Sequence, residues 1–373
     1  MMKTNPIGLY VHIPFCVKKC NYCDFCSFSE IDSVTRGAYI DRLCDEITCY
    51  AGKNIEIDTI FFGGGTPTLL TADEFARIVN TVKKSFVVSQ KNEFTVEANP
   101  GTTTKEKIQG FVQNGVNRFS IGLQSIHKNE LKILGRIHNF DDFKRTYHDM
   151  RSAGISNINV DLMYGIPEQT KDSFQKTLLE VAKLSPEHLS VYGLILEEGT
   201  PFFERKEILP LPDEEDECDM YSSAVIFLNN HGYSHYEISN YAKPGFESKH
   251  NLKYWRNREY IGVGVSAYSY FCGMRFGNTK NLPDYINNRA TIAYSEKITK
   301  DTEKYEYVML ALRLREGFSL DEYKSLFLED FMSGREDLIL NLQKNGYLSL
   351  ENGRVALTDR GFYVSNYILT ELL

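Results

Sequence analysis

The first half of the chain alternates short apolar segments with longer amphipathic segments, and this alternation constrains the fold more than any other feature. The strand-like apolar segments are 8–13, 59–62, 94–98, 118–122, 158–163 and 189–194. The helix-like segments between them are 38–50, 72–86, 105–114, 141–153 and 171–184. Strands that alternate with helices form a parallel sheet with right-handed crossovers. Six strands are too few for an eight-stranded barrel, so we expect an α/β fold built on a partial (β/α)6 barrel, with its site at the carboxyl ends of the strands.

Several residues predict where helices begin and end. Thr71 and Asp141 are predicted helix starts, and Gly115 and Gly154 are predicted helix ends. A proline-rich loop and the acidic run 213–217 then interrupt the alternation. We interpret the acidic run as negative charge placed at the N-terminus of a helix, where the helix dipole favours it.

The C-terminal part changes character again. Helical patterns at 303–315, 319–326 and 335–345 precede a hairpin whose turn is 352–353, an Asn-Gly pair. This order resembles a small winged-helix-like α+β module, and without a basic face a lid or docking role is favoured over DNA binding. We therefore predict three parts, which are a partial barrel that holds the site at 1–212, a linking α/β segment at 213–300 and the C-terminal module at 301–373.

The charge and hydropathy of the chain argue against several function classes. The net charge is −8, so we expect no basic surface that would attract nucleic acid or anionic lipid. No apolar run approaches the ~20 residues that span a bilayer, and the N-terminal segment has no apolar stretch of signal-peptide length. We expect a soluble, cytoplasmic protein without disulfides, in which the scattered cysteines are buried thiols: Cys44, Cys49, Cys218 and Cys272.

Three cysteines lie within eight residues after the first predicted strand, at Cys16, Cys20 and Cys23. This spacing suits three irons of a cubane cluster and leaves the fourth iron open, as a redox cluster needs if it is to bind and reduce a ligand. Cys26 follows three residues later, so four thiols could instead enclose a structural zinc or a fully capped ferredoxin-type cluster. The bacterial ferredoxin run differs, because its longer gap comes last and proline follows it. An iron–sulfur cluster is favoured, and zinc stays open.

Polar or glycine residues follow the other predicted strands. Loop 63–67, of sequence GGGTP, comes directly after the second strand, and its glycines would let the backbone approach a ligand closely. Glu97 ends the third strand, Gln124 follows the fourth, and Asp161 lies on the fifth. Arg136 comes twelve residues after Gln124. Each could be a buried polar group or a helix cap, but together they could encircle a polar, charged small molecule.

The cysteine loop, the segment YVHIP at 10–14 and the glycine loop together resemble the radical S-adenosylmethionine (SAM) superfamily. Within it, the chain is similar to the oxygen-independent coproporphyrinogen oxidase-like group over essentially its whole length. The resemblance implies that Cys16, Cys20 and Cys23 ligate a 4Fe–4S cluster and that the methionyl part of SAM chelates the fourth iron. It also implies a SAM site lined by Tyr10, Tyr22, Gly64, Gly65, Thr66, Glu97, Gln124, Arg136 and Asp161.

Two departures separate the members of this group. The oxidase carries a further cysteine where this chain has Phe25, and a sizeable N-terminal arm where only fifteen residues precede Cys16 here. The chain instead resembles the heme chaperone family, whose signature H-N-x-x-Y-W is intact at 250–255 and includes the only Trp. This resemblance implies heme as a ligand. The candidate axial ligands are His250 and its rivals His12, His231 and His235.

The function implied by this resemblance is heme carriage. The protein would bind heme and transfer it to a heme-requiring acceptor such as a respiratory membrane enzyme, with the cluster and SAM regulating or enabling the transfer. Dimerisation under cluster control is a further implication, and the role of Cys26 stays open. Two enzymatic alternatives also stay open. They are an oxygen-independent coproporphyrinogen III dehydrogenase, which oxidatively decarboxylates two propionates, and a radical SAM heme methyltransferase.

Overall fold

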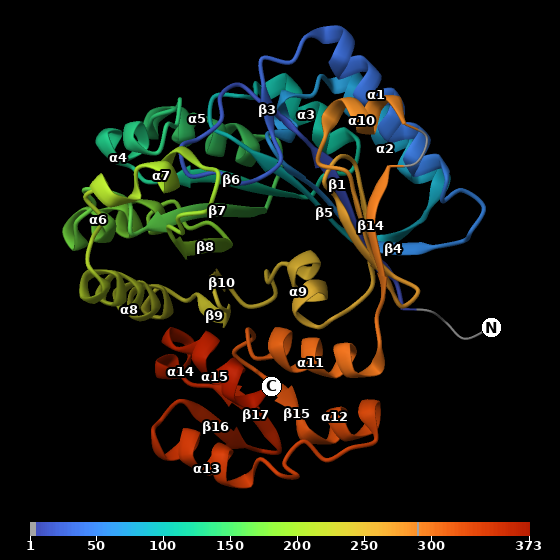
Figure 1. Ribbon diagram of the computed structural model, residues 1–373. Coiled ribbons are helices and arrows are strands. Elements are labelled where there is room, and N and C mark those ends of the chain that lie inside the picture. The colour runs from blue at the N-terminus through green and yellow to red at the C-terminus, as the bar shows by residue number, and fades with distance from the viewer. Residues whose placement is uncertain (1–4, 289–290) are drawn as a thin grey trace.

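Six parallel strands form the centre of the molecule in the computed structural model, which describes residues 5–288 and 291–373 (Figure 1). The strands lie side by side in sequence order and are β1 (Ile7–Ile13), β4 (Glu56–Gly64), β5 (Val87–Ala98), β6 (Arg118–Gln124), β7 (Asn157–Tyr164) and β8 (His188–Gly193). The helices between them are α1 (Ser33–Thr48), α2 (Ala72–Ser85), α3 (Lys105–Gln113), α4 (Lys128–Ile133), α5 (Phe140–Ser152) and α6 (Lys171–Ala182). The predicted α/β partial barrel is confirmed. Residues 1–4, where the predicted N-terminal segment begins, lie outside the described part.

The segment after β8 extends the sheet at both edges. At one edge, β10 (Asn240–Ala242) pairs antiparallel with β8, and β9 (Ser234–Glu237) pairs with β10. At the other edge, β11 (Tyr260–Val263) runs parallel to β1. Three antiparallel strands continue outward from β11, and they are β12 (Tyr268–Phe271), β13 (Met274–Asn278) and β14 (Ile292–Lys297). The result is a 12-stranded sheet that ends at β14 and β9.

Helices of this same segment cover other parts of the barrel. They are α7 (Pro201–Glu204), α8 (Glu214–Asn230), α9 (Lys249–Trp255) and α10 (Leu282–Asn287). Asp213 caps α8, and the acidic residues 214–217 occupy its first turn, as the helix-dipole interpretation predicts. The HNxxYW signature lies on α9, which sits between the sheet and the C-terminal module (Figure 1).

Side chains alternate along each central strand between two faces. The outward residues are apolar and form the main core with the helices, and they include Leu9, Val11, Phe62, Val96, Ile121 and Val160. The inward residues are mostly polar, and strand register aligns them in rows. One row runs across four neighbouring strands, through Glu97, Ser120, Asn159 and His188. The interior of the barrel is therefore polar, while its outer face holds the hydrophobic core.

Most predicted helix boundaries agree with the structure. Thr71 caps α2 in a capping box with Glu74, and Gly115 and Gly154 follow α3 and α5 with positive φ. The predicted start at Asp141 is wrong by two residues. Asn139 is the N-cap instead, because its side chain accepts hydrogen bonds from the backbone N–H groups of residues 141 and 142.

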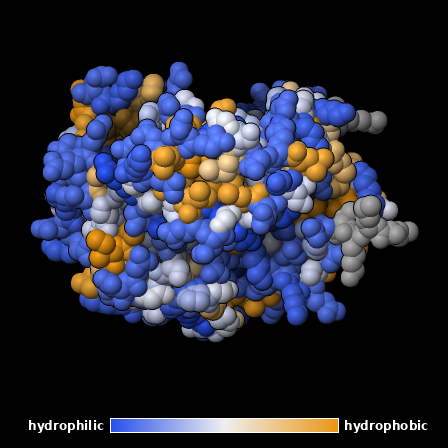
Figure 2. Space-filling view, turned by 90° about the horizontal axis from the view of Figure 1, so that it is seen from below, coloured by the Kyte–Doolittle hydropathy of each residue, from blue (hydrophilic) through white to orange (hydrophobic). Residues whose placement is uncertain are grey.

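The C-terminal module is α+β and has its own hydrophobic core. Its helices are α11 (Lys300–Ala311), α12 (Leu320–Phe327), α13 (Glu336–Lys344), α14 (Asp359–Tyr363) and α15 (Ser365–Leu372). A three-stranded antiparallel sheet joins β15 (Phe318–Ser319), β17 (Arg354–Leu357) and β16 (Leu348–Glu351). The predicted hairpin turn is confirmed, because Asn352 and Gly353 both have positive φ. Figure 2 shows hydrophobic side chains near the middle of the face seen from below, where this module lies.

The scattered cysteines differ from expectation. Cys44 is buried, but Cys49, Cys218 and Cys272 are exposed. Cys49 follows the last residue of α1, and Cys272 lies in the turn between β12 and β13, so neither side chain reaches the core. Over residues 5–288 and 291–373, no helix combines the length and the apolar character that crossing a membrane requires.

Candidate functional site

The cysteine loop lies at the carboxyl end of β1 and is fixed at several points. The short strands β2 (Phe15–Cys16) and β3 (Phe28–Ser29) pair across its base. Asn21 anchors its middle to the end of α4, because its side chain donates to the Ile133 carbonyl at 2.8 Å and its backbone N–H donates to Leu134 at 3.0 Å. These contacts fix the base and the middle of the loop.

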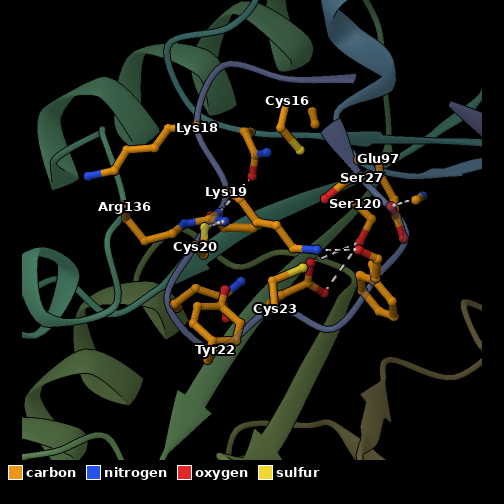
Figure 3. A pocket seen from close by; sticks show the side chains of 18 of the residues that line it. Cys16, Lys18, Lys19, Cys20, Tyr22, Cys23, Ser27, Glu97, Ser120 and Arg136 are labelled. Atoms are coloured by element: carbon orange, nitrogen blue, oxygen red, sulfur yellow. Dashed lines mark hydrogen bonds between the residues drawn. The ribbon is translucent and has the colours of Figure 1, made fainter. Parts of the chain in front are cut away.

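Three of the loop's thiols line one pocket of about 120 Å³ (Figure 3). They are Cys16, Cys20 and Cys23, as the motif predicts. Cys26 is turned elsewhere, since its Sγ donates to the Lys280 carbonyl at 3.5 Å. The pocket therefore presents three thiols rather than the four that a closed tetrahedral zinc site would use.

Two of these sulfur atoms have a side-chain hydrogen-bond donor nearby. The Thr66 hydroxyl lies 3.8 Å from Cys16 Sγ, and Arg136 Nη1 lies 3.5 Å from Cys20 Sγ. Burial raises the pKa of Cys16 and raises that of Cys23 to about 11. Thiolates are the ligands of iron–sulfur clusters, and donors to the sulfurs tune such clusters. The donor set and its surroundings therefore fit a 4Fe–4S cluster held by three cysteines.

The glycine loop packs against the cysteine loop. The Gly65 and Thr66 N–H groups donate to the carbonyls of Ile13 and Phe15 at 2.8 and 2.7 Å. A Cβ on Gly65 would lie 2.7 Å from the Phe15 oxygen. Gly64 has φ +106°, and a Cβ there would lie 2.4 Å from the His12 ring. These glycines are thus required by the contact between two loops, in addition to any approach to a ligand.

Two half-buried carboxyl groups face the pocket from the strands. Glu97 accepts a hydrogen bond from the Gly64 N–H at 3.1 Å, and Asp161 accepts one from Asn159 at 2.6 Å. Burial, and then the nearby charge of Asp161, raise the pKa of Glu97 to about 8. Burial also raises the pKa of Asp161, although the hydrogen bond from Asn159 opposes this. Such a pair would attract a cationic ligand that also carries hydroxyl groups.

Arg136, Gln124 and Tyr22 also line the pocket. Arg136 donates to Asn99 Oδ1 at 2.7 Å and to the Gly122 carbonyl. Gln124 has φ +71°, a strained value for a residue with a side chain, and accepts a hydrogen bond from Tyr192 at 2.8 Å. Figure 3 shows Arg136 and Tyr22 on the side of the pocket that holds Cys20.

Not every predicted site residue lies in this pocket. Thr66 lines a smaller cavity beside it, between Cys20 and Asn99. Tyr10 lies beneath the glycine loop, where its hydroxyl is 2.9 Å from His12 Nδ1. The predicted site leaves out nine other residues of the lining, which are Lys18, Lys19, Phe25, Ser27, Ala98, Asn99, Ser120, Gly122 and Tyr192.

His250 lies inside the barrel, on α9. Its Nδ1 is 2.8 Å from the Thr59 hydroxyl and its Nε2 is 2.8 Å from the Tyr254 hydroxyl, while its ring stacks on Phe61. Burial lowers its pKa to about 3, so the ring is neutral. Both ring nitrogens are therefore occupied by protein partners.

The rival histidines lie apart from one another. His12 bonds to Tyr10 and to the Cys26 carbonyl. His231 stacks on Phe227 at the exposed end of α8, and His235 stacks on Tyr241 near the C-terminal module.

Comparison with known proteins identifies the family. Residues 10–181 match the Radical SAM superfamily, and residues 298–364 match the HemN C-terminal domain. The chain is 34% identical to the heme chaperone HemW of Lactococcus lactis over 376 aligned positions, which cover 100% of this chain and 98% of the relative. The chain belongs to the HemW family. It is likewise 34% identical to HemW of Bacillus subtilis, with 98% of each chain covered, and 36% identical to that of Escherichia coli, with 85% of each covered.

The fold agrees with a solved structure from the same superfamily. Coproporphyrinogen III oxidase HemN of Escherichia coli superposes with a TM-score of 0.85 over 98% of this chain and 90% of that chain, at 24% identity. This likeness supports the architecture of the barrel and of the C-terminal module. Membership in the Radical SAM superfamily implies a 4Fe–4S cluster and SAM, which agrees with the three-thiol pocket.

Proposed function

We propose that this protein is a heme chaperone, which binds heme and passes it to an acceptor protein. The observation that carries the proposal is the full-length likeness to HemW, which includes the HNxxYW helix. Phe25, in place of the oxidase's additional cysteine, favours this function over coproporphyrinogen III oxidation.

In this proposal, Cys16, Cys20 and Cys23 hold the 4Fe–4S cluster. When bound there, the cluster would supply a redox centre with one iron open to a ligand. SAM would occupy the pocket between the cluster and the strand ends. Its site would comprise Tyr10, Tyr22, Gly64, Gly65, Thr66, Glu97, Gln124, Arg136 and Asp161. Glu97 and Asp161 would accept hydrogen bonds from its ammonium or hydroxyl groups, and Tyr10 would act from beneath the glycine loop.

His250 is the proposed axial ligand of heme. An imidazole is a common ligand of heme iron, and here it would exchange its contact with Thr59 or Tyr254 for the metal. The acceptor would be a respiratory enzyme and the compartment the cytoplasm. The exposed Leu326, Leu328 and Leu340 of the C-terminal module would favour docking to the acceptor or to a second copy of the chain.

The test begins with anaerobic reconstitution of the cluster, followed by titration with heme and transfer to a heme-free acceptor. We expect saturable binding of heme and recovery of acceptor activity. His250→Ala should weaken binding, while His231→Ala, at an exposed position, should not. Failure of the cluster-loaded protein to take up heme would overturn the proposal. So would loss of two carboxyl groups from coproporphyrinogen III in the presence of SAM and a reductant, because that outcome identifies an oxidase.

A further inference from the structure

A line of hydrogen bonds crosses the interior of the barrel from the proposed SAM pocket to the HNxxYW helix. It begins at Asp161, whose Oδ1 is 2.6 Å from Asn159 Nδ2. Asn159 Oδ1 is 2.6 Å from His188 Nδ1, and His188 Nε2 is 2.8 Å from the Tyr236 hydroxyl. That hydroxyl lies 3.2 Å from the backbone nitrogen of Ser248, which is the N-cap of α9.

Each bond in this line donates toward Asp161. The side-chain amide of Asn159 donates to the carboxylate, so its oxygen must accept from His188 Nδ1–H. Burial lowers the pKa of His188 well below its usual value, so the ring is neutral and its Nε2 is an acceptor. Tyr236 must then donate to Nε2, and its oxygen is left to accept the Ser248 N–H. Hydrogen bonds that point the same way polarise and strengthen one another.

The middle of the line is buried and fully bonded. Asn159 is 2% exposed and His188 is 0% exposed. Besides Asp161 and His188, Asn159 contacts the hydroxyls of Ser120 at 2.7 Å and Ser190 at 3.2 Å, so its amide makes all four hydrogen bonds that it can make. A change of orientation at Asn159 would leave buried groups unpaired, which is costly. The line can therefore transmit a constraint from one end to the other.

Two further hydrogen bonds at the amino end of α9 come from the inner face of the barrel. The N–H groups of Lys249 and His250 donate to the Glu93 carboxylate at 3.0 and 3.1 Å. Glu93 lies on β5, four residues before Glu97 and on the same face. Thus β5, which contributes Glu97 to the proposed SAM pocket, also holds the amino end of α9 directly through Glu93. The strand β7, which contributes Asp161, reaches α9 only through His188 and Tyr236.

We propose that Asn159, His188 and Tyr236 are positioning residues that couple ligand binding at Asp161 to the stability of the HNxxYW helix. The proposal rests on the proposed function for its ligand, SAM. A ligand that bonds to Asp161 fixes the acceptor at the end of the line, and so it stabilises α9 and His250 in the arrangement described above. By reciprocity, a ligand that displaces α9 weakens SAM binding by the same factor.

Tyr236→Phe breaks this line at one hydroxyl without changing the ring. Tyr233→Phe is the control, because Tyr233 is a buried tyrosine next to the same strand, β9, whose hydroxyl donates to the Pro186 carbonyl, outside the line. Amide hydrogen exchange of 248–255 would be measured in the cluster-loaded protein, with and without saturating SAM. We expect SAM to slow exchange about fivefold or more in the wild type and in Tyr233→Phe. We expect less than about a twofold effect in Tyr236→Phe.

A second break, His188→Phe, removes both the donor and the acceptor at this position and should likewise abolish the effect of SAM on α9. Equilibrium dialysis would establish that each variant is saturated with SAM at the concentration used in the exchange experiment. Equal slowing in Tyr236→Phe and Tyr233→Phe would overturn the proposal, as would exchange in the wild type that does not respond to SAM. Amide hydrogen exchange is measured here without heme. A failure of heme uptake would therefore refute the proposed function, whereas the coupling between Asp161 and α9 would still be tested by the exchange rates.

Discussion

At the scale of single residues, Cys23 and Cys26 are three positions apart and have different surroundings. Cys23 faces the pocket with Cys16 and Cys20, whereas the Cys26 sulfur donates to the Lys280 carbonyl. The spacing of thiols along the chain does not reveal this, because the direction of Cys26 depends on residues more than 250 positions later.

We expect Cys23→Ser to lose the cluster and Cys26→Ser to keep it, because a hydroxyl is a poor substitute for a thiolate as an iron ligand. Iron and acid-labile sulfide per chain after anaerobic reconstitution would measure this, with the exposed Cys49→Ser as a control. Cys26→Ser should hold about four irons, as the wild type does. If Cys26→Ser loses iron to the same extent as Cys23→Ser, Cys26 is a ligand and the three-thiol interpretation is wrong.

Some pocket residues that were not predicted could have been found from the alternation of side chains along the strands. Asn99 lies two positions after Glu97, and Ser120 lies four before Gln124, so strand alternation puts each pair on one face. Both could have been predicted. Tyr192 could not, because its contact with Gln124 depends on how β6, β7 and β8 are aligned.

At the scale of elements, the central strands and helices were predictable because each carries a periodic apolar pattern. The start of β5 was not, since Val87 and Val88 pair with β4 ahead of the polar stretch 89–93. The glycine loop was identified as a ligand loop, but its packing against the His12 ring and the cysteine loop depends on contacts between two strand ends.

This packing makes Gly64 the most sensitive position of the loop. Gly64→Ala would place a Cβ against the His12 ring, which would then have to leave Tyr10 and the Cys26 carbonyl. We expect a loss of stability of about 3 kcal/mol and weaker SAM binding. Gly101→Ala is the control, because Gly101 has φ +78° and no atom lies within 4 Å of an added Cβ. This substitution should lower the free energy of unfolding by about 1–2 kcal/mol, from backbone strain alone. Urea denaturation would measure the free energy of unfolding of both variants. Equal losses of stability in Gly64→Ala and Gly101→Ala would contradict the packing argument.

At the scale of the whole molecule, the barrel and the C-terminal module have separate hydrophobic cores that meet at β9. The Ile238 N–H donates to the Arg313 carbonyl, and the Arg315 N–H donates to the Tyr236 carbonyl, both at 3.0 Å. Glu237, between these two bonds, is 0% exposed. Sequence alone could not predict this junction or the strands at both edges of the sheet, because their partners are distant in the chain.

Glu237 should make the stability of the protein depend on pH. Burial raises its pKa to about 7, from 4.5, so folding favours the protonated form. Its contribution to stability is complete below about pH 4.5 and is lost as pH rises through about 7. We expect the melting temperature of the wild type to fall more than that of Glu237→Gln between about pH 5 and about pH 8. Glu371→Gln, at an exposed site on α15, should behave as the wild type, and parallel profiles for all three proteins would refute this role.

The pairing of β1 with β11 has a consequence for biosynthesis. Gly8 finds its partner, Tyr260, only after most of the chain has been translated. Until then, one edge of β1 is unpaired on the nascent chain, although the cysteine loop next to it has long left the ribosome. Contacts so distant in sequence form slowly. Cluster insertion can therefore meet a chain whose barrel is still incomplete, and nascent-chain chaperones would be expected to shield the exposed β1 edge during that interval.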